Sequence, residues 1–122
     1  MADDPQSNTR LPIISFDDFL KVDIRLGTII DAKVFEDAKK AAYQLWIDFG
    51  DPLGIKKSSA QVVQNYALGE LIGRRVAAVV NFEPKQIGKF MSEVLTLGFP
   101  SAEGEVVLVS PEQPVPNGAR LF

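Results

Sequence analysis

The sequence predicts a mainly β domain in which five strands form a Greek-key barrel, with one short helix inserted between the third and fourth strands. Apolar and polar residues alternate over residues 25–35 and 43–49, as in strands covered on one face. Apolar residues run without a break over residues 76–80, as in a strand buried on both faces. Several small α+β folds share this order of elements, so the pattern leaves them as alternatives to the barrel.

Composition limits the functions open to this chain. With 122 residues, 46% of them hydrophobic and 24% charged, it has the size and make-up of one globular domain. The sequence contains no Cys and no His, which removes the thiolate nucleophile, the commonest metal ligand and the commonest general base. We therefore expect a binding protein without cofactor or metal, and not an enzyme.

Charge and hydropathy bound the partners and the compartment. The formal net charge of -3 argues against a general nucleic-acid binder, although a local basic patch is compatible with that total. The sequence has no run of about 18 apolar residues, and no secretory leader opens it. We expect a cytoplasmic protein that does not insert into membranes.

The N-terminal region predicts a tail followed by a helix. Residues 1–14 lack periodicity and are expected to be flexible, so that the domain spans residues 15–122. Ser15 is a good N-cap, and Asp17 and Asp18 suit the positive end of a helix. The apolar face of this short helix consists of Phe16, Phe19 and Leu20.

The first two strands are expected to have distinct faces. In the first strand, one face carries Thr28, Ile30, Ala32 and Val34, and the other carries Asp31 and Lys33. Gly27 predicts a bulge or a close backbone approach. The buried face of the second strand consists of Tyr43, Leu45, Ile47 and Phe49. Trp46 falls on its polar face, either as a half-covered strand residue, as a subunit contact or as a stacking surface for a ligand.

The inserted helix is expected soon after the third strand. Residues 50–54 form a turn by composition, and residues 55–58 form a short strand. Ser58 and Gln61 have the spacing of a capping box, which predicts that the helix begins at this point. Its buried stripe would consist of Val62, Val63 and Tyr66.

The connection after the buried strand at residues 76–80 is the most informative part of the chain. Pro84 and Gly88 mark a loop there, and another strand starts at Met91. Polar and basic side chains on a loop held by packed strands are how a binding site is usually mounted. A last buried strand is expected over residues 106–109.

Four segments together resemble the tRNA-binding domain found at the C-terminus of bacterial methionyl-tRNA synthetases and in related stand-alone proteins. They are residues 23–29 (DIRLGTI), 57–62 (KSSAQV), 81–85 (NFEPK) and 88–95 (GKFMSEVL). Residues 43–50 (YQLWIDFG) and 114–118 (PVPNG) are similar to a branch of protein-export chaperones. The resemblance covers residues 15–122.

This resemblance implies an oligonucleotide/oligosaccharide-binding (OB) fold and a homodimer built by N- and C-terminal extensions. The chaperone branch implies binding of unfolded or pre-export polypeptides, contact with the export motor SecA and a role in protein secretion. Relatives that bind tRNA often carry Ser-Gln or Ser-Glu-Gly-Met where this chain has residues 92–95 (SEVL), as in the chaperone branch. The residues expected at the dimer interface are Phe16, Phe19, Leu20, Trp46, Pro116, Leu121 and Phe122.

A peptide or RNA site is expected around the central connection. Its candidate residues are Lys57, Ser58, Gln61, Asn81, Phe82, Lys85, Lys89, Phe90, Met91, Ser92 and Glu93. The aromatic and thioether members would accept varied apolar side chains, unless they pack in the core. The lysines would form a basic patch with Lys56 if they line the barrel mouth, with residues 39–40 and 74–75 as weaker candidates. Arg25 is either part of the site or an ion-pair anchor for the terminal helix.

Two functions therefore compete. The first is a chaperone that binds extended polypeptides. The second is a tRNA-binding module, in which the same face stacks bases on aromatic residues and follows phosphates with lysines. An enzyme using Lys89, Ser92 and Glu93 is a third class, but without His or Cys these residues form no specific constellation.

Overall fold

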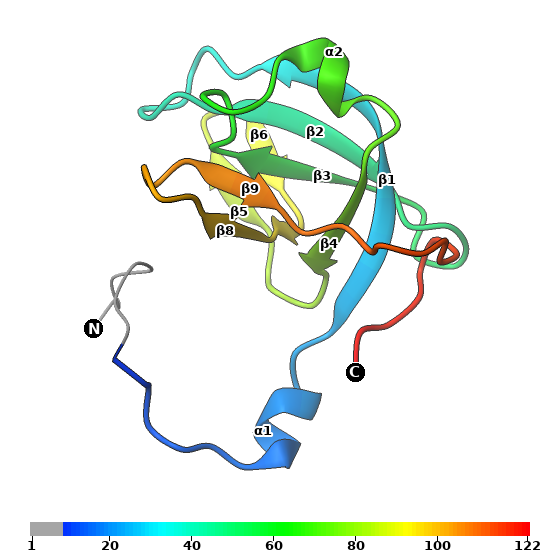
Figure 1. Cartoon of the computed structure of the whole chain (residues 1–122). Helices are drawn as coiled ribbons and strands as arrows, with labels where there is room; N and C mark the ends of the chain where they lie inside the picture. The colour runs from blue at the N-terminus through cyan, green and yellow to red at the C-terminus, as the bar shows by residue number, and fades with distance from the viewer. Residues whose placement is uncertain (1–8) are drawn as a thin grey trace.

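The computed structural model describes residues 9–122 and has a five-stranded, nearly closed barrel at its centre (Figure 1). The strands of the main sheet are β1 (Ile24–Val34), β2 (Tyr43–Asp48), β3 (Ile55–Ala60), β4 (Arg75–Val79) and β7 (Leu95–Thr96). Their order in the sheet is β3-β2-β1-β4-β7, and all the pairs are antiparallel. The predicted barrel with a helix between its third and fourth strands is confirmed.

The barrel closes where β3 approaches the chain just before β7. The backbone N–H groups of Glu93 and Val94 donate to the Lys57 carbonyl at 2.7 and 3.2 Å. Two hairpins complete the described strands. They consist of β5 (Lys85–Ile87) with β6 (Phe90–Ser92), and β8 (Gly98–Pro100) with β9 (Val106–Leu108).

The core sits inside the barrel and follows the predicted alternation of β2. Leu45, Ile47 and Phe49 are fully buried, and Tyr43 is buried beside them. The continuous burial predicted over residues 76–80 is confirmed for residues 76–79 of β4, which are all buried, while Val80 is half-buried. The prediction of a buried last strand is confirmed only in part. Leu108 of β9 is buried in the core, whereas Val107, whose side chain points to the opposite face, is 39% exposed.

The predicted assignment of the β1 side chains to two faces was wrong from Ile30 onward. The register with β2 shifts between Ile29 and Asp31, so that Ile29 is fully buried and Ile30 is 44% exposed. Val34, assigned to the same face as Ile30, is exposed as well. A bulge adds one residue to a strand and reverses the faces that follow, which a simple alternation does not reveal. Gly27 confirms the expected close approach, since a Cβ there would lie 2.5 Å from Ile47 Cγ2.

The predicted start of the inserted helix was also wrong. Ser58 lies within β3, opposite Leu45 of β2, and is fully buried. The helix α2 (Leu68–Leu71) begins seven residues after Gln61, and no side chain caps it at Ala67. Pairing of β3 with β2 gives the backbone of residues 55–60 its hydrogen bonds, and it overrides the local capping signal. Figure 1 shows α2 at one end of the barrel.

Helix α1 (Phe16–Leu20) confirms the predicted N-terminal helix. The Asp18 N–H donates to Ser15 Oγ at 3.1 Å, and the Ser15 N–H donates to Asp18 Oδ2 at 3.2 Å, which completes a capping box. The hydrogen bond that the Asp18 carboxylate accepts from the Ser15 N–H, followed by the one from the Lys21 ammonium and then by the Ser15 hydroxyl, holds the pKa of Asp18 below its ordinary value. None of the helical residues is buried, and Figure 1 shows the helix standing away from the barrel.

The remaining predictions concern the N-terminal tail and the location of the protein. Most of the predicted tail, residues 1–8, lies outside the described residues, while residues 9–14 are exposed and form no helix or strand. The boundary between tail and domain stays a prediction. Between residues 9 and 122, no helix has the length and apolarity needed to cross a membrane. The cytoplasmic location also stays a prediction.

Candidate functional site

A pocket of about 300 Å³ opens beside the loop that follows β4. We call it the Phe82 pocket, and its lining consists of Phe82, Glu83, Lys85, Ser92, Glu93, Val94 and Leu95. The lining is largely apolar and has carboxylates and one ammonium group at its margin. Phe82 is 56% exposed, so its ring is available to a ligand. The structure therefore brings together four of the predicted site residues, namely Phe82, Lys85, Ser92 and Glu93.

Hydrogen bonds to β3 hold one wall of this pocket in place. Glu93 Oε1 accepts from the Lys57 N–H at 3.0 Å, and the Glu93 N–H donates to the Lys57 carbonyl. Ser92 Oγ accepts from the Ser59 N–H at 3.0 Å. Glu93 and Ser92 thus fasten the end of β6 to the barrel. A wall fixed in this way needs little ordering when a ligand binds.

A second pocket, of about 510 Å³, adjoins the first at Lys85. We call it the Lys39 pocket, and its lining consists of Asp37, Ala38, Lys39, Lys40, Ala42, Ser59, Gln61, Lys85, Gln86, Ile87 and Gly88. It contains Gln61, which was predicted as a site residue. It also contains Lys39 and Lys40, which were expected to be weaker candidates for the basic patch. Three lysines face one carboxylate here, so the pocket carries a positive balance.

The other aromatic candidate packs in the protein. Phe90 is 7% exposed and stacks edge-on against Phe35 and Trp46, with ring centroids 5.2 and 6.0 Å away. The ammonium groups of Lys57 and Lys33 lie over the rings of Phe90 and Trp46, at 5.3 and 5.1 Å from the centroids. These contacts agree with core packing for Phe90 and with a half-covered strand position for Trp46. They hold β6 of the β5–β6 hairpin against Phe35 and against Trp46 of β2.

The remaining predicted site residues take different positions. Ser58 is buried, and its Oγ accepts from Thr96 Oγ1 at 2.8 Å. Lys89 is exposed at the turn of the β5–β6 hairpin, and Met91 is 36% exposed on β6. Lys89 and Met91 line neither of the two pockets and belong to the exposed surface of the hairpin, while the burial of Ser58 gives it a structural role.

Asn81 and Arg25 belong to a polar cluster that fixes the ends of the chain. Asn81 Oδ1 accepts from the Asp23 N–H at 3.0 Å, and its Nδ2 donates to the Lys21 carbonyl at 2.7 Å. Arg25 Nε donates to Asp23 Oδ1 at 2.6 Å, and Arg25 Nη1 donates to the Gly118 carbonyl. The Asp23 hydrogen bond raises the pKa of Arg25. The ion-pair interpretation of Arg25 is confirmed, and the amide of Asn81 anchors α1.

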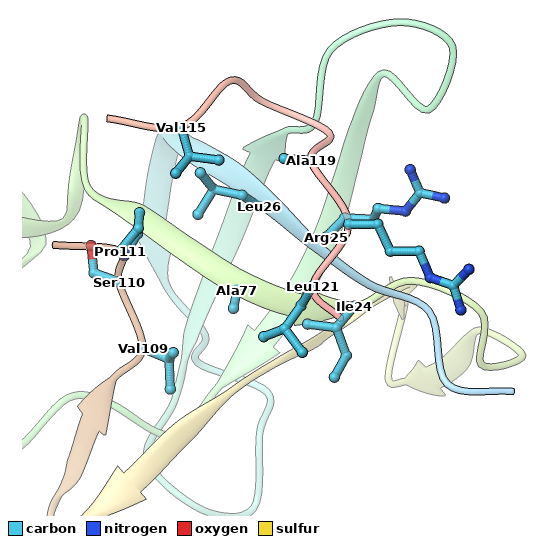
Figure 2. Close-up of a pocket in the computed structure, with 11 residues that line it drawn as sticks. Ile24, Arg25, Leu26, Ala77, Val109, Ser110, Pro111, Val115, Ala119 and Leu121 are labelled. Carbon is cyan, nitrogen blue, oxygen red and sulfur yellow. The ribbon is translucent and has the colours of Figure 1, made fainter. Parts of the chain in front are cut away.

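A third hollow, of about 230 Å³, lies close to this cluster (Figure 2). We call it the terminal pocket. It is almost wholly apolar and is formed by β1, β4 and the C-terminal segment, with Ile24, Leu26, Ala77 and Leu121 among its lining residues. Figure 2 shows Ile24 and Leu121 side by side and the Arg25 guanidinium turned away from the hollow.

Comparison with known protein families shows which family this chain belongs to. Residues 24–120 match the family described as "Putative tRNA binding domain". This chain belongs to that family. The match covers the barrel, the Phe82 and Lys39 pockets and all of the terminal pocket's lining except Leu121.

Solved structures confirm the resemblance to the chaperone branch of this family. The chaperone CsaA of Bacillus anthracis superposes with a TM-score of 0.85 at 45% identity, covering 91% of this chain and 100% of that one. The CsaA chaperone protein of Picrophilus torridus gives a TM-score of 0.84 at 46% identity, covering 90% and 100% of the two chains. The fold prediction is thereby confirmed, including the OB type of barrel.

Curated relatives confirm the link to methionyl-tRNA synthetases. The methionine–tRNA ligase of Flavobacterium johnsoniae is 31% identical over 121 residues, which are 99% of this chain and 17% of that protein. The ligase of Pelodictyon phaeoclathratiforme is 34% identical over 110 residues, which are 90% of this chain and 15% of that protein. The chain thus spans about a sixth of the length of these relatives.

Proposed function

We propose that this protein is a dimeric chaperone that binds unfolded or pre-export polypeptides in the groove formed by the Phe82 and Lys39 pockets, and so assists protein secretion. The observation that carries the proposal is the 45% and 46% identity to two CsaA chaperones along their whole lengths. A contact with the export motor SecA belongs to the same proposal. The chain acts by binding and not by catalysis.

The chemistry of the groove supports polypeptide binding. Phe82 offers an exposed aromatic surface in a pocket with a fixed wall, which suits apolar side chains of different shapes. Met91 adds a flexible thioether on the neighbouring strand. A promiscuous site needs such adaptable apolar contacts, because its clients share no single sequence.

The terminal segments support the dimer. Leu11, Ile13, Ile14 and Phe16 are 57%, 84%, 64% and 71% exposed, which leaves a contiguous apolar stretch of chain without cover in the monomer. Patches of this kind on a soluble chain mark interaction sites. The terminal pocket offers an apolar surface near the same end, and Leu121 and Phe122 are exposed beside it. We propose that a second copy covers this surface.

The predicted interface residues divide into two groups under this proposal. Phe16, Phe19 and Leu20 on α1 form one set with Pro116, Leu121 and Phe122 at the C-terminus, and this set belongs to the subunit contact. Trp46 is separate, because its ring packs on Phe90 within its own chain. Its role at the interface stays a prediction.

The proposal is tested by titrating the purified protein with a labelled unfolded preprotein segment and with bulk tRNA, each at low and physiological salt. Peptide binding that survives salt, and that Phe82→Ala weakens, supports the chaperone. Phe99→Ala is a matched control, because Phe99 is an exposed aromatic on the β8–β9 hairpin. Failure of the peptide to bind would overturn the proposal.

A tRNA-binding module is the second candidate, favoured by the family description and by the positive balance of the Lys39 pocket. Its affinity for tRNA would fall steeply with salt, because lysines that contact phosphates release counterions. Tight tRNA binding with that dependence, together with weak peptide binding, would replace the chaperone by this function.

A further inference from the structure

The Phe82 and Lys39 pockets carry opposite charge balances. Glu83 and Glu93 accompany Lys85 at the Phe82 pocket, giving a formal balance of one negative charge. At the Lys39 pocket, Lys39, Lys40 and Lys85 face Asp37, giving a formal balance of two positive charges. The groove is therefore electrically polar along its length.

Strand β5 joins the two pockets. Lys85 at its start lines both of them, and Gln86 and Ile87 line only the Lys39 pocket of the two. Among the described strands β5 pairs with β6 alone, and no backbone hydrogen bond between its other edge and a described residue is seen. An extended peptide added to such an edge gains backbone hydrogen bonds that do not depend on its sequence.

The geometry of an extended chain sets the spacing. Side chains two residues apart lie on the same face of a strand, about 6.6 Å from each other. The Phe82 pocket meets β5 at Lys85 and the Lys39 pocket extends from Lys85 to Gly88, so a peptide running along β5 would place one side chain at the Phe82 pocket and another, two to four residues away, at the Lys39 pocket.

We propose that the groove selects polypeptide segments in which an apolar side chain lies two to four residues from an acidic one. The apolar side chain occupies the Phe82 pocket, and the carboxylate lies between Lys39, Lys40 and Lys85. This inference rests on the proposed chaperone function and names the class of client segment that the site prefers.

The same charges argue for a peptide carboxylate over a nucleic-acid backbone. A polyanion following the groove would bring phosphates against Glu83 and Glu93 as well as against the lysines. The phosphates and these carboxylates are both negative, and their repulsion would oppose binding of the whole strand. A segment with one carboxylate at one end avoids this conflict.

The test uses three short labelled peptides that differ at one position. Each carries a single Leu, and two residues further along it carries Asp, Asn or Lys. Fluorescence anisotropy at low salt measures the binding of each peptide to the intact protein. We expect Asp→Asn to weaken binding about fivefold, as for an exposed charge pair, and Lys to bind more weakly still.

Variants of the protein locate the effect. K39Q/K40Q is expected to weaken the Asp peptide to the level of the Asn peptide and to leave the Asn peptide unchanged. K39E/K40E is expected to reverse the order, so that the Lys peptide binds best, which a misfolded variant would not produce. K21Q is the matched control, because Lys21 is an exposed lysine next to α1 and lines neither pocket.

Each outcome has a distinct meaning. Equal binding of the three peptides to the wild-type protein would overturn this inference and leave the chaperone function standing. No binding of any peptide would overturn the proposed function itself. If K39Q/K40Q abolishes tRNA binding and leaves the preference among the peptides unchanged, the lysines serve RNA and the inference is wrong.

Discussion

Two regions of this molecule, α1 and the loop after β4, expose aromatic side chains in different surroundings. Phe16 on α1 is 71% exposed, with Ile13 and Ile14 as neighbours in sequence that are also exposed. Phe82 is 56% exposed but shares its pocket with charged residues of both signs. A surface on which apolar side chains predominate, as they do over residues 11–16, resembles a domain core cut in half and suits a permanent partner. A surface that combines apolar and charged groups suits ligands that bind transiently.

The largest expected effect is at α1. Phe16→Ser should raise the dissociation constant of the dimer about 100-fold, because a two-fold contact loses one buried aromatic ring from each subunit. Size-exclusion chromatography with light scattering across a dilution series measures this constant. Phe99→Ser serves as the control, and an unchanged oligomeric state in the Phe16 variant would contradict the assignment of the terminal surface.

The next effect is at the groove. Phe82→Ala should weaken binding of an unfolded segment about tenfold, the effect of removing a moderately important aromatic contact. Fluorescence anisotropy measures the loss, and light scattering should show the dimer unchanged. A variant that keeps its affinity for peptide but loses its dimer would reverse the roles assigned to the two surfaces.

A smaller effect is expected at Glu93, which holds one wall of the Phe82 pocket to β3. Glu93→Ala leaves the Lys57 N–H without the carboxylate that it donates to at 3.0 Å. We expect the free energy of unfolding to fall by about 1 kcal/mol, the usual contribution of one hydrogen bond. Urea unfolding followed by tryptophan fluorescence measures it. Glu83→Ala is a matched control, because Glu83 lines the same pocket and is exposed.

The smallest effect is the pH dependence of α1. Hydrogen bonds from the Ser15 N–H, and next from the Lys21 ammonium, depress the pKa of Asp18 from its ordinary value of 3.8. A depressed pKa in the folded state means that the carboxylate stabilises the helix above pH 3.8 and that this contribution is lost as the pH falls through the folded pKa. NMR titration of the Ser15 and Asp18 amides should show the helix start loosening in that acidic range. Asp18→Asn should remove the response, and a persistent response would assign it to another group.

Local pattern was enough to predict some elements and some contacts. The alternation in β2 has its predicted buried face because Leu45, Ile47 and Phe49 need only the pleat of one strand to share a side. Ser15 caps the helix α1 as predicted, because the capping box lies within four consecutive residues. At the site, Phe82 and Lys85 fall on the connection that the sequence singled out.

Contacts between distant segments were the source of the errors. Ser58 and Gln61 fit a capping box, but the pairing of β3 with β2 makes Ser58 a buried strand residue. Lys39 and Lys40 were ranked as weak because nothing in their own segment distinguishes them. They line the Lys39 pocket only because their loop approaches residues 85–88 of the β5–β6 hairpin.

By itself, the sequence determined the class of fold, the family and the helix start, because periodicity, capping and short motifs act within a few residues. The tertiary structure decided the bulge near Ile29, the burial of Ser58 and the division of the groove into an apolar and a basic pocket. Those features depend on register and on which loops meet, and both follow from pairing between segments far apart in the chain.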